Sequence, residues 1–207
     1  MQPAKIGKYE IVRLIGEGST GTVYKAFDPL VDRFVALKVI PGEKVSKPEN
    51  LQRFKKEVRA QGRLLHPNVA MLFDVVFSNG DYIIVMEYVE GRCLREVMQE
   101  EKIFTLQGFY GIIGQVCLGL ASAHRQGVVH RDIKPENLRL TPEGRVKILD
   151  FSIAKIQSAT QTSAHMNFLL GSGHYMAPVL ILGQAVTPAG DQFAVGVISY
   201  EMLTCRR

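Results

Sequence analysis

Two loops of this chain carry side chains that can exchange protons and hold metal ions. The first loop, His130–Asn137, holds the carboxylate Asp132 among two cations and a carboxamide. Pro135 resists helix formation and biases the residue before it toward extended backbone, so we expect a loop here. The second loop carries another carboxylate, Asp150, directly after an apolar, strand-like run. Either loop alone would pass for a polar surface turn, but two such loops at strand ends indicate a site.

The residue types in these loops suit phosphoryl transfer. Mg²⁺ takes hard oxygen ligands, commonly one or two carboxylates completed by phosphate oxygens, and Asp150 with the Asn137 carboxamide meets that need. Asp132 is then available to orient an attacking hydroxyl and accept its proton, while Lys134 stabilises negative charge on the transferred phosphate. Metal ligands of an unrelated hydrolase are the alternative interpretation of the same side chains.

A glycine-rich segment, Gly16–Gly21, is a candidate phosphate cover. Its G-x-G-x-x-G spacing suits any turn that needs positive φ, and it also opens dinucleotide-binding folds. Here a strand-like run, Thr22–Ala26, follows the segment, whereas in dinucleotide-binding folds the third glycine opens a helix. A glycine-rich hairpin offers backbone N–H groups without obstruction by side chains, so we expect it to lie over nucleotide phosphates.

Lys38 is a single cation in the apolar run Val35–Lys38, and Glu57 lies within an expected helix. A lone lysine in a strand usually points to solvent. A carboxylate that holds a lysine within reach of phosphates is, however, what phosphoryl transfer needs. The pair, placed after this glycine-rich segment, therefore favours a nucleotide site.

A sheet and a helix are expected to position these residues. Alternating and β-branched runs bounded by turn residues predict five strands, over residues 9–15, 22–28, 33–40, 69–77 and 81–88. A helix is expected from Pro48 or Glu49 to Leu65, where His66–Pro67–Asn68 ends it.

After Glu90–Gly91 the pattern becomes helical, with helices expected over residues 94–100, 105–126 and about 191–203. Thr105 is the expected N-cap of the second helix. The last helix is apolar on nearly every face, as expected of a buried helix. A stretch rich in Ser and Thr covers residues 157–167.

The overall composition fits a globular protein. Of the 207 residues 46% are apolar and 22% are charged, and the net charge of +5 is spread over both signs, which disfavours nucleic acid as a partner. Three cysteines lack metal-ligand spacing, so a reducing, cytoplasmic location is expected. The N-terminus lacks the apolar core of a signal peptide, and no run approaches the roughly 18 apolar residues of a membrane span.

Together these motifs resemble those of the protein kinases, from Tyr9 to Cys205. The resemblance implies an α+β, bilobal protein-kinase-like fold. Residues 9–89 would form a five-stranded antiparallel N-lobe with one helix. Residues 90–207 would form a mainly helical, incomplete C-lobe that ends after the helix at about 191–203. The implied reaction is Mg-ATP-dependent transfer of the γ-phosphoryl group to serine or threonine hydroxyls of protein substrates. The sequences of the loops are similar to those of bacterial kinases of eukaryotic type.

The resemblance also assigns roles to residues. The implied catalytic residues are Asp132, Lys134, Lys38 and Glu57, and the implied ligands of Mg²⁺, or of Mn²⁺ in its place, are Asn137 and Asp150. The implied ATP contacts are Ile15, Gly16, Gly18, Gly21, Val23, Ala36, Lys38, Met86, Glu87, Val89 and Arg139. Asp191 matches the residue that anchors the catalytic loop of the family.

Four positions depart from the family pattern: Gln61, Arg139, Ser152 and Val179. Val179 stands where a glutamate is expected after Ala177–Pro178. With the short C-lobe, Arg139, Ser152 and Val179 motivate a second hypothesis, a pseudokinase or nucleotide-binding interaction module without turnover. A short lobe would also leave apolar surface exposed, so a partner or a missing segment is expected to cover it.

Arg131, next to Asp132, indicates control by phosphorylation, because a phosphate on a mobile loop would pair with it. The candidate acceptors are Ser158, Thr160, Thr162 and Ser163, of which the last two are favoured by position. The alternative is that backbone carbonyls satisfy Arg131.

Overall fold

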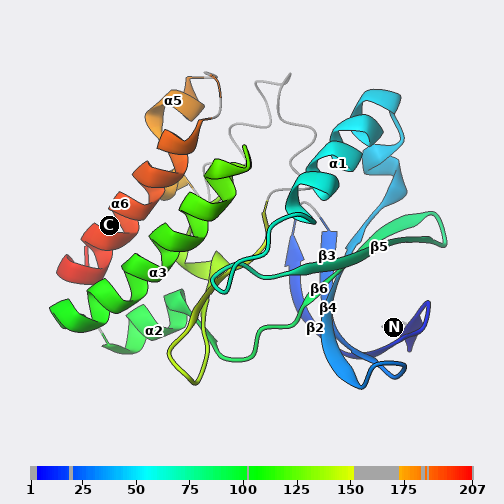
Figure 1. The fold of residues 1–207 in the computed structure, drawn as a ribbon, viewed down its shortest axis with the longest axis horizontal. Coiled ribbons are helices and arrows are strands. Elements are labelled where there is room, and N and C mark those ends of the chain that lie inside the picture. The colour runs from blue at the N-terminus through cyan, green and yellow to red at the C-terminus, as the bar shows by residue number, and fades with distance from the viewer. Residues whose placement is uncertain are drawn as a thin grey trace. The chain divides into compact units, whose positions relative to one another are not determined.

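The computed structural model describes residues 4–18, 21–101, 103–151, 173–182, 185 and 187–206 (Figure 1). Within these ranges the chain forms two compact units. The sheet unit comprises the described residues up to Arg63 together with Ala70–Tyr88. The helical unit comprises Leu64–Val69 and the described residues from Val89 onward.

The sheet unit is one antiparallel sheet of six strands in the order β1-β2-β3-β4-β6-β5. The strands are β1 (Lys5–Ile6), β2 (Tyr9–Gly18), β3 (Gly21–Asp28), β4 (Arg33–Ile40), β5 (Leu72–Ser78) and β6 (Asp81–Glu87). The five expected strands are confirmed as β2–β6, and the short β1 adds an edge. The strand expected from Val69 begins later, at Leu72, because Val69 pairs with Ile148 in the helical unit.

The two faces of this sheet bury different side chains, because successive residues of a strand point to opposite sides. On β4, Val35 and Leu37 belong to one core cluster, whereas Ala36 and Ile40 belong to the other. The second cluster includes Phe54 of helix α1 (Pro48–Gln61), which therefore covers that face of the sheet.

Helix α1 begins with Pro48 at its first position, where the missing N–H costs nothing. It ends at Gln61, one turn earlier than the expected end at Leu65. Leu64 is buried in the core of the helical unit, and Leu65 is exposed. The chain thus leaves the helix because Leu64 packs elsewhere, and Leu65, the predicted last residue of the helix, lies outside it.

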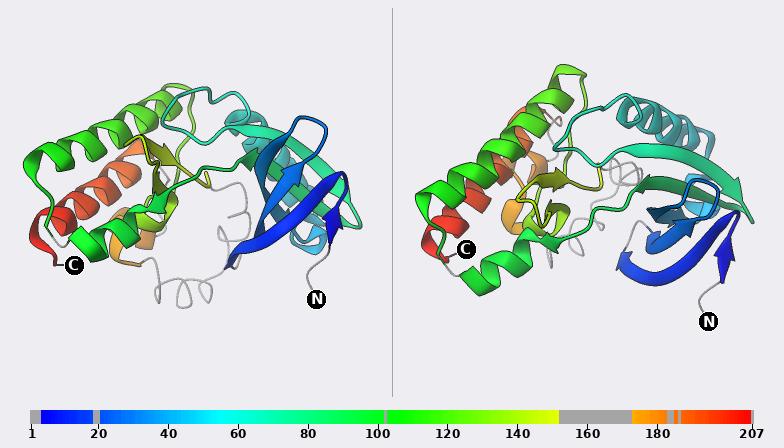
Figure 2. Two further views of the ribbon diagram at one scale, coloured as in Figure 1. Left: turned by 90° about the horizontal axis from the view of Figure 1, so that it is seen from below. Right: turned by 60° about the horizontal axis from the view of Figure 1, so that its bottom comes forward.

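The helical unit contains helices α2 (Leu94–Glu101), α3 (Leu106–Arg125), α5 (Pro178–Ile181) and α6 (Pro188–Thr204). It also contains the short helices η2 (Pro135–Asn137) and η3 (Gly173–Tyr175), and a small antiparallel sheet of β7 (Arg92–Cys93), β8 (Leu138–Leu140) and β9 (Val146–Ile148). Helices α3 and α6 lie side by side in both views of Figure 2, and Val116, Leu120, Ile148, Ile198 and Met202 are part of their shared core.

Helix α3 begins as expected, with the Thr105 hydroxyl accepting a hydrogen bond from Gly108 N–H at 3.1 Å. By length and composition it is the one helix among the described residues that is apolar enough to cross a membrane, with a mean hydropathy of 1.3. Its buried residues, Val116 and Leu120 among them, pack in the core of the helical unit. A core helix passes the same composition test, so this feature alone carries no conclusion about a membrane.

Helix α6 was expected to be buried all round, and this expectation is only half right. Ala194, Ile198 and Met202 are in the core. Phe193 and Tyr200, on the other face, are 41% and 54% exposed. The apolar face opposite the core is therefore open to solvent in the described part of the chain.

Candidate active site

The loop His130–Asn137 is held by a single carboxylate from α6. One oxygen of Asp191 accepts the backbone N–H of His130 at 2.8 Å, and the other accepts that of Arg131 at 2.9 Å. His124 of α3 lies 2.8 Å from the same carboxylate, which is buried. Asp191 therefore fixes the start of the loop, including Arg131, whose φ of 69° lies in the left-handed region.

His130 connects this loop to the one that carries Asp150. Burial lowers the pKa of the fully buried imidazole, so the neutral ring is favoured. Its Nε2 lies 2.8 Å from the Leu149 carbonyl oxygen, and its Nδ1 lies 3.3 Å from the backbone nitrogen of Asp132. These contacts fit a neutral ring with the proton on Nε2, which donates to Leu149 while Nδ1 accepts from Asp132. One buried ring thus ties the two carboxylate-bearing loops together.

Asp132 is flanked by the two side chains that the sequence placed beside it. Lys134 Nζ lies 3.3 Å from Asp132 Oδ2, and Asn137 Nδ2 lies 3.4 Å from the same oxygen. Asn137 Nδ2 also donates to the Asp132 backbone carbonyl at 2.8 Å. The backbone of Asn137 is fixed in turn, because its carbonyl accepts the Leu149 N–H at 2.8 Å. Asp132, Lys134 and Asn137 therefore form one cluster.

The predicted metal ligands lie in the same unit on these tied loops. Because the Asn137 nitrogen is turned toward Asp132, its amide oxygen is the atom left to meet a cation. Asp150 follows Leu149 directly, with a positive φ of 58°. A carboxamide oxygen and a carboxylate are the hard ligands that Mg²⁺ and Mn²⁺ accept, with phosphate oxygens and water completing the shell. The donor set fits such an ion.

The sheet unit holds the predicted phosphate- and adenine-contacting residues up to Glu87. Gly16 lies opposite Val23 in the β2–β3 pair. Gly21 has a φ of 150°, and a Cβ there would lie 2.1 Å from the Val39 carbonyl oxygen, so only glycine fits. The remaining predicted contacts on β2, Ile15 and Gly18, lie on the same hairpin.

Lys38 is 4% exposed, in the middle of the sheet between Val23 on β3 and Ile84 on β6. It does not point to solvent, which removes the ordinary alternative for a lysine in a strand. Glu57 lies on α1, and its exposure is intermediate. The ion pair between Lys38 and Glu57 stays a prediction.

The predicted adenine-site residues of the sheet unit fall into one cluster. Val23, Ala36 and Met86 share the core cluster on the α1 side of the sheet, and Ala36 is paired with Met86. The Glu87 backbone N–H donates to the Met71 carbonyl at 2.8 Å.

Val89 and Arg139 belong to the helical unit. Val89 is buried, and Arg139 on β8 donates from Nη1 to the Gly91 carbonyl at 2.7 Å. The side chain of Arg139, one of the departures from the family pattern, is thus bonded to the backbone.

Sequence reasoning missed a charged network centred on Arg95 of α2. Arg95 Nη1 lies 2.6 Å from Glu201 Oε1 on α6, and its Nε lies 3.0 Å from Glu136 Oε1 in the loop His130–Asn137. The Tyr175 hydroxyl bonds to both Arg95 and Glu201. The network could have been predicted from Glu201, because a carboxylate within a nearly all-apolar helix needs a cationic partner once buried.

The ionisation of this network follows from its burial. Burial and the hydrogen bond to Glu201 raise the pKa of Tyr175 to about 12, so the phenol keeps its proton. Burial lowers the pKa of Arg95, but hydrogen bonds to Glu201, Glu136 and Tyr175 outweigh it and leave the pKa raised. Tyr175 also lines a small hollow of about 20 Å³ together with Asp132. The network therefore links the segment around Tyr175 to α2, α6 and the loop His130–Asn137.

Some predicted residues lie outside the described part of the chain. These are Ser152 and the candidate phosphorylation sites Ser158, Thr160, Thr162 and Ser163. Val179 is described, and it is exposed on α5.

Comparison with known proteins gives one consistent result. A family model described as a protein kinase domain matches residues 9–207. The probable serine/threonine-protein kinase pknA2 of Bifidobacterium longum is 40% identical, over 98% of this chain and 27% of that protein. PrkC of Bacillus subtilis is 38% identical, over 97% of this chain and 31% of its own length, and PknA of Mycobacterium tuberculosis is 38% identical, over 97% and 48%. The chain thus spans less than half the length of these relatives.

Proposed function

The chain belongs to the protein kinase family, and we propose that it transfers the γ-phosphoryl group of ATP to serine and threonine hydroxyls of proteins. The observation that carries this proposal is the placement of Asp132. Its carboxylate lies between Lys134 and Asn137, on a loop whose backbone is held by the buried Asp191. The names of the relatives, all serine/threonine-protein kinases, support the same activity.

In the proposed reaction Asp132 orients the substrate hydroxyl and accepts its proton. The hydroxyl oxygen bonds to the γ-phosphorus, the bond to the β–γ bridging oxygen breaks, and ADP leaves. Lys134, 3.3 Å from Asp132, stabilises the charge on the transferred group. His130 and Asp191 act through the backbone, because they fix where Asp132 lies.

Asn137 and Asp150 would hold the divalent cation, which when bound neutralises charge on the β- and γ-phosphate oxygens. We propose Mg²⁺ as this cation, with Mn²⁺ able to use the same hard ligands. Gly16, Gly18 and Gly21 would cover the phosphates, and Lys38, positioned by Glu57, would bind them. Ile15, Val23, Ala36, Met86, Glu87, Val89 and Arg139 would enclose the adenine.

This reaction suits a reducing compartment that contains ATP, and we propose the cytoplasm for the catalytic part. None of the three described cysteines, Cys93, Cys117 and Cys205, forms a disulfide bond. The second hypothesis, a nucleotide-binding module without turnover, gains no support from the relatives, since each is named a kinase.

The proposal is tested by incubating the 207-residue chain with Mg²⁺, γ-labelled ATP and a generic basic protein. We expect acid-stable label on serine and threonine of the added protein, of the chain, or of both. Label that appears only on tyrosine, or no label from a folded preparation that binds ATP, would contradict the proposal.

A further inference from the structure

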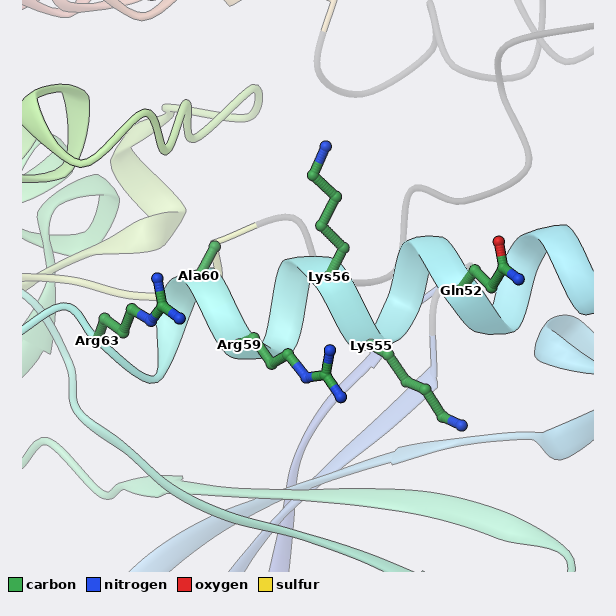
Figure 3. Close-up of a pocket in the computed structure, with 6 residues that line it drawn as sticks. All are labelled: Gln52, Lys55, Lys56, Arg59, Ala60 and Arg63. Carbon is green, nitrogen blue, oxygen red and sulfur yellow. The ribbon is translucent and has the colours of Figure 1, made fainter.

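The outer face of α1 carries a stripe of positive charge. Lys55, Lys56 and Arg59 of the helix and Arg63 just beyond it line a shallow groove of about 470 Å³, together with Gln52 and Ala60. Figure 3 shows Lys55 and Arg59 extending to one side of the helix and Lys56 to the other. Ala60, the smallest of these side chains, leaves room between the longer ones. We call these four cations the α1 stripe.

The stripe is not neutralised within the described part of the chain. All four cations are exposed, and none forms an ion pair with a described carboxylate. Lys55 and Arg59 are four residues apart on α1, and Arg63 follows four residues after Arg59, just beyond the end of the helix. Like charges at this spacing on a helix repel each other. The stripe therefore costs stability, and an anionic partner would relieve that cost.

We propose that the α1 stripe binds an acidic protein segment in extended conformation. Along a helix, cations four residues apart are separated by about 6 Å. Along an extended chain, alternate side chains are separated by roughly 6.6 Å. A segment with acidic residues at every second position therefore places its carboxylates in step with Lys55, Arg59 and Arg63. The groove lining from Gln52 to Arg63 spans about 16 Å, the length of roughly five extended residues.

Two other anionic partners fit the stripe less well. Single-stranded nucleic acid is commonly bound on aromatic side chains, and the groove lining includes none. Helices that lie in a membrane surface bury an exposed apolar face, but the apolar side chains of α1, Leu51, Phe54 and Val58, are already packed in the core of the sheet unit. A groove also suits a narrow chain better than a flat bilayer.

The test measures binding directly, so its outcome does not depend on the proposed kinase activity. Fluorescence anisotropy of a labelled peptide of alternating Glu and Ser is followed as the full chain is added, beside a counterpart with Lys in place of Glu. The variant K55Q/R59Q removes two charges of the stripe. The control R53Q removes an exposed charge of the same helix that does not line the groove. Gln and these cations have similar helix propensities, so both variants are expected to fold.

We expect the Glu peptide to bind, the Lys peptide not to bind, and the affinity to fall as salt is added. K55Q/R59Q should weaken binding about tenfold, and R53Q should change it by less than about twofold. Equal weakening by K55Q/R59Q and R53Q would overturn the proposal, and so would absence of binding. Tighter binding of the stripe to a DNA oligonucleotide or to phosphatidylserine vesicles, lost in K55Q/R59Q, would assign it to those partners instead.

Discussion

At the scale of the residue, Arg95 illustrates what a buried charge requires in this fold. Its guanidinium donates hydrogen bonds to Glu201, Glu136 and Tyr175 at the same time. Each charge of the network therefore has an opposite charge or a hydrogen-bond donor beside it. Breaking such a pair on one side leaves the other charge buried and uncompensated, which costs far more than the pair contributes.

Arg95→Met is therefore expected to lower the free energy of unfolding by about 3–5 kcal/mol, since Glu201 stays buried without its cation. Arg92→Met is the matched control, because the Arg92–Glu100 pair is exposed and should contribute less than about 1 kcal/mol. Urea unfolding of both variants provides the measurement. Equal losses in the two would show that Arg95 does not act through buried charge.

His130 makes the free energy of unfolding depend on pH. Burial lowers its pKa in the folded chain below the ordinary value, so the unfolded chain binds a proton there first as the pH falls. Stability from this residue is thus present above the unfolded pKa of about 6.5 and is lost as the pH drops toward the folded pKa.

Between about pH 7.5 and 5.5 the free energy of unfolding should fall, and His130→Gln, although less stable, should lose this part of the slope. His174→Gln is the control, because His174 is exposed and should leave the slope unchanged. Urea titrations at several pH values measure the slope. A His130→Gln slope identical to that of the wild type would refute the assignment.

At the scale of the element, helix α3 uses its glycines for different reasons. A Cβ on Gly119 would lie 2.8 Å from Ile148 Cδ1 and 3.1 Å from the Asn68 carbonyl oxygen, whereas a Cβ on Gly114 would meet nothing within 4 Å. Gly119 thus permits the close packing of α3 on β9 and the Asn68 segment. Gly114 has no packing function that the described residues show.

Gly114→Ala should therefore stabilise the chain by about 0.4–1 kcal/mol, because alanine loses less backbone entropy in a helix. Gly119→Ala, with the same gain in helix propensity, should destabilise it by about 1–3 kcal/mol, because the added methyl group overpacks the core. Thermal unfolding of the two variants measures the difference. Stabilisation by both would mean that Gly119 is not tightly packed.

The strands, the helices and the loop at residues 130–137 could be predicted from the sequence because their signals are local. Strand periodicity placed β2–β6, and the spacing of Asp132, Lys134 and Asn137 placed them on one loop. The features that the sequence did not predict depend on contacts between residues far apart in the chain. The end of α1 depends on Leu64 packing into the helical unit, and the network of Arg95 joins residues far apart in sequence.

At the scale of the whole molecule, the proposed reaction draws on both units. Lys38, Glu57 and the glycine-rich hairpin belong to the sheet unit, and Asp132, Asn137 and Asp150 belong to the helical unit. Neither unit holds the full set of predicted residues, so the proposal draws residues from each.

The most direct test of the central claim is the single-turnover rate of phosphate transfer from bound ATP, measured for wild type, Asp132→Asn and the exposed control Asp74→Asn. Asp132→Asn removes the proton acceptor while leaving the nucleotide contacts in place. We predict that it keeps the ATP affinity within about twofold and slows transfer by about 10²–10⁴-fold, the usual contribution of a general base. Asp74→Asn should match the wild type. Transfer by Asp132→Asn at the wild-type rate would contradict the account.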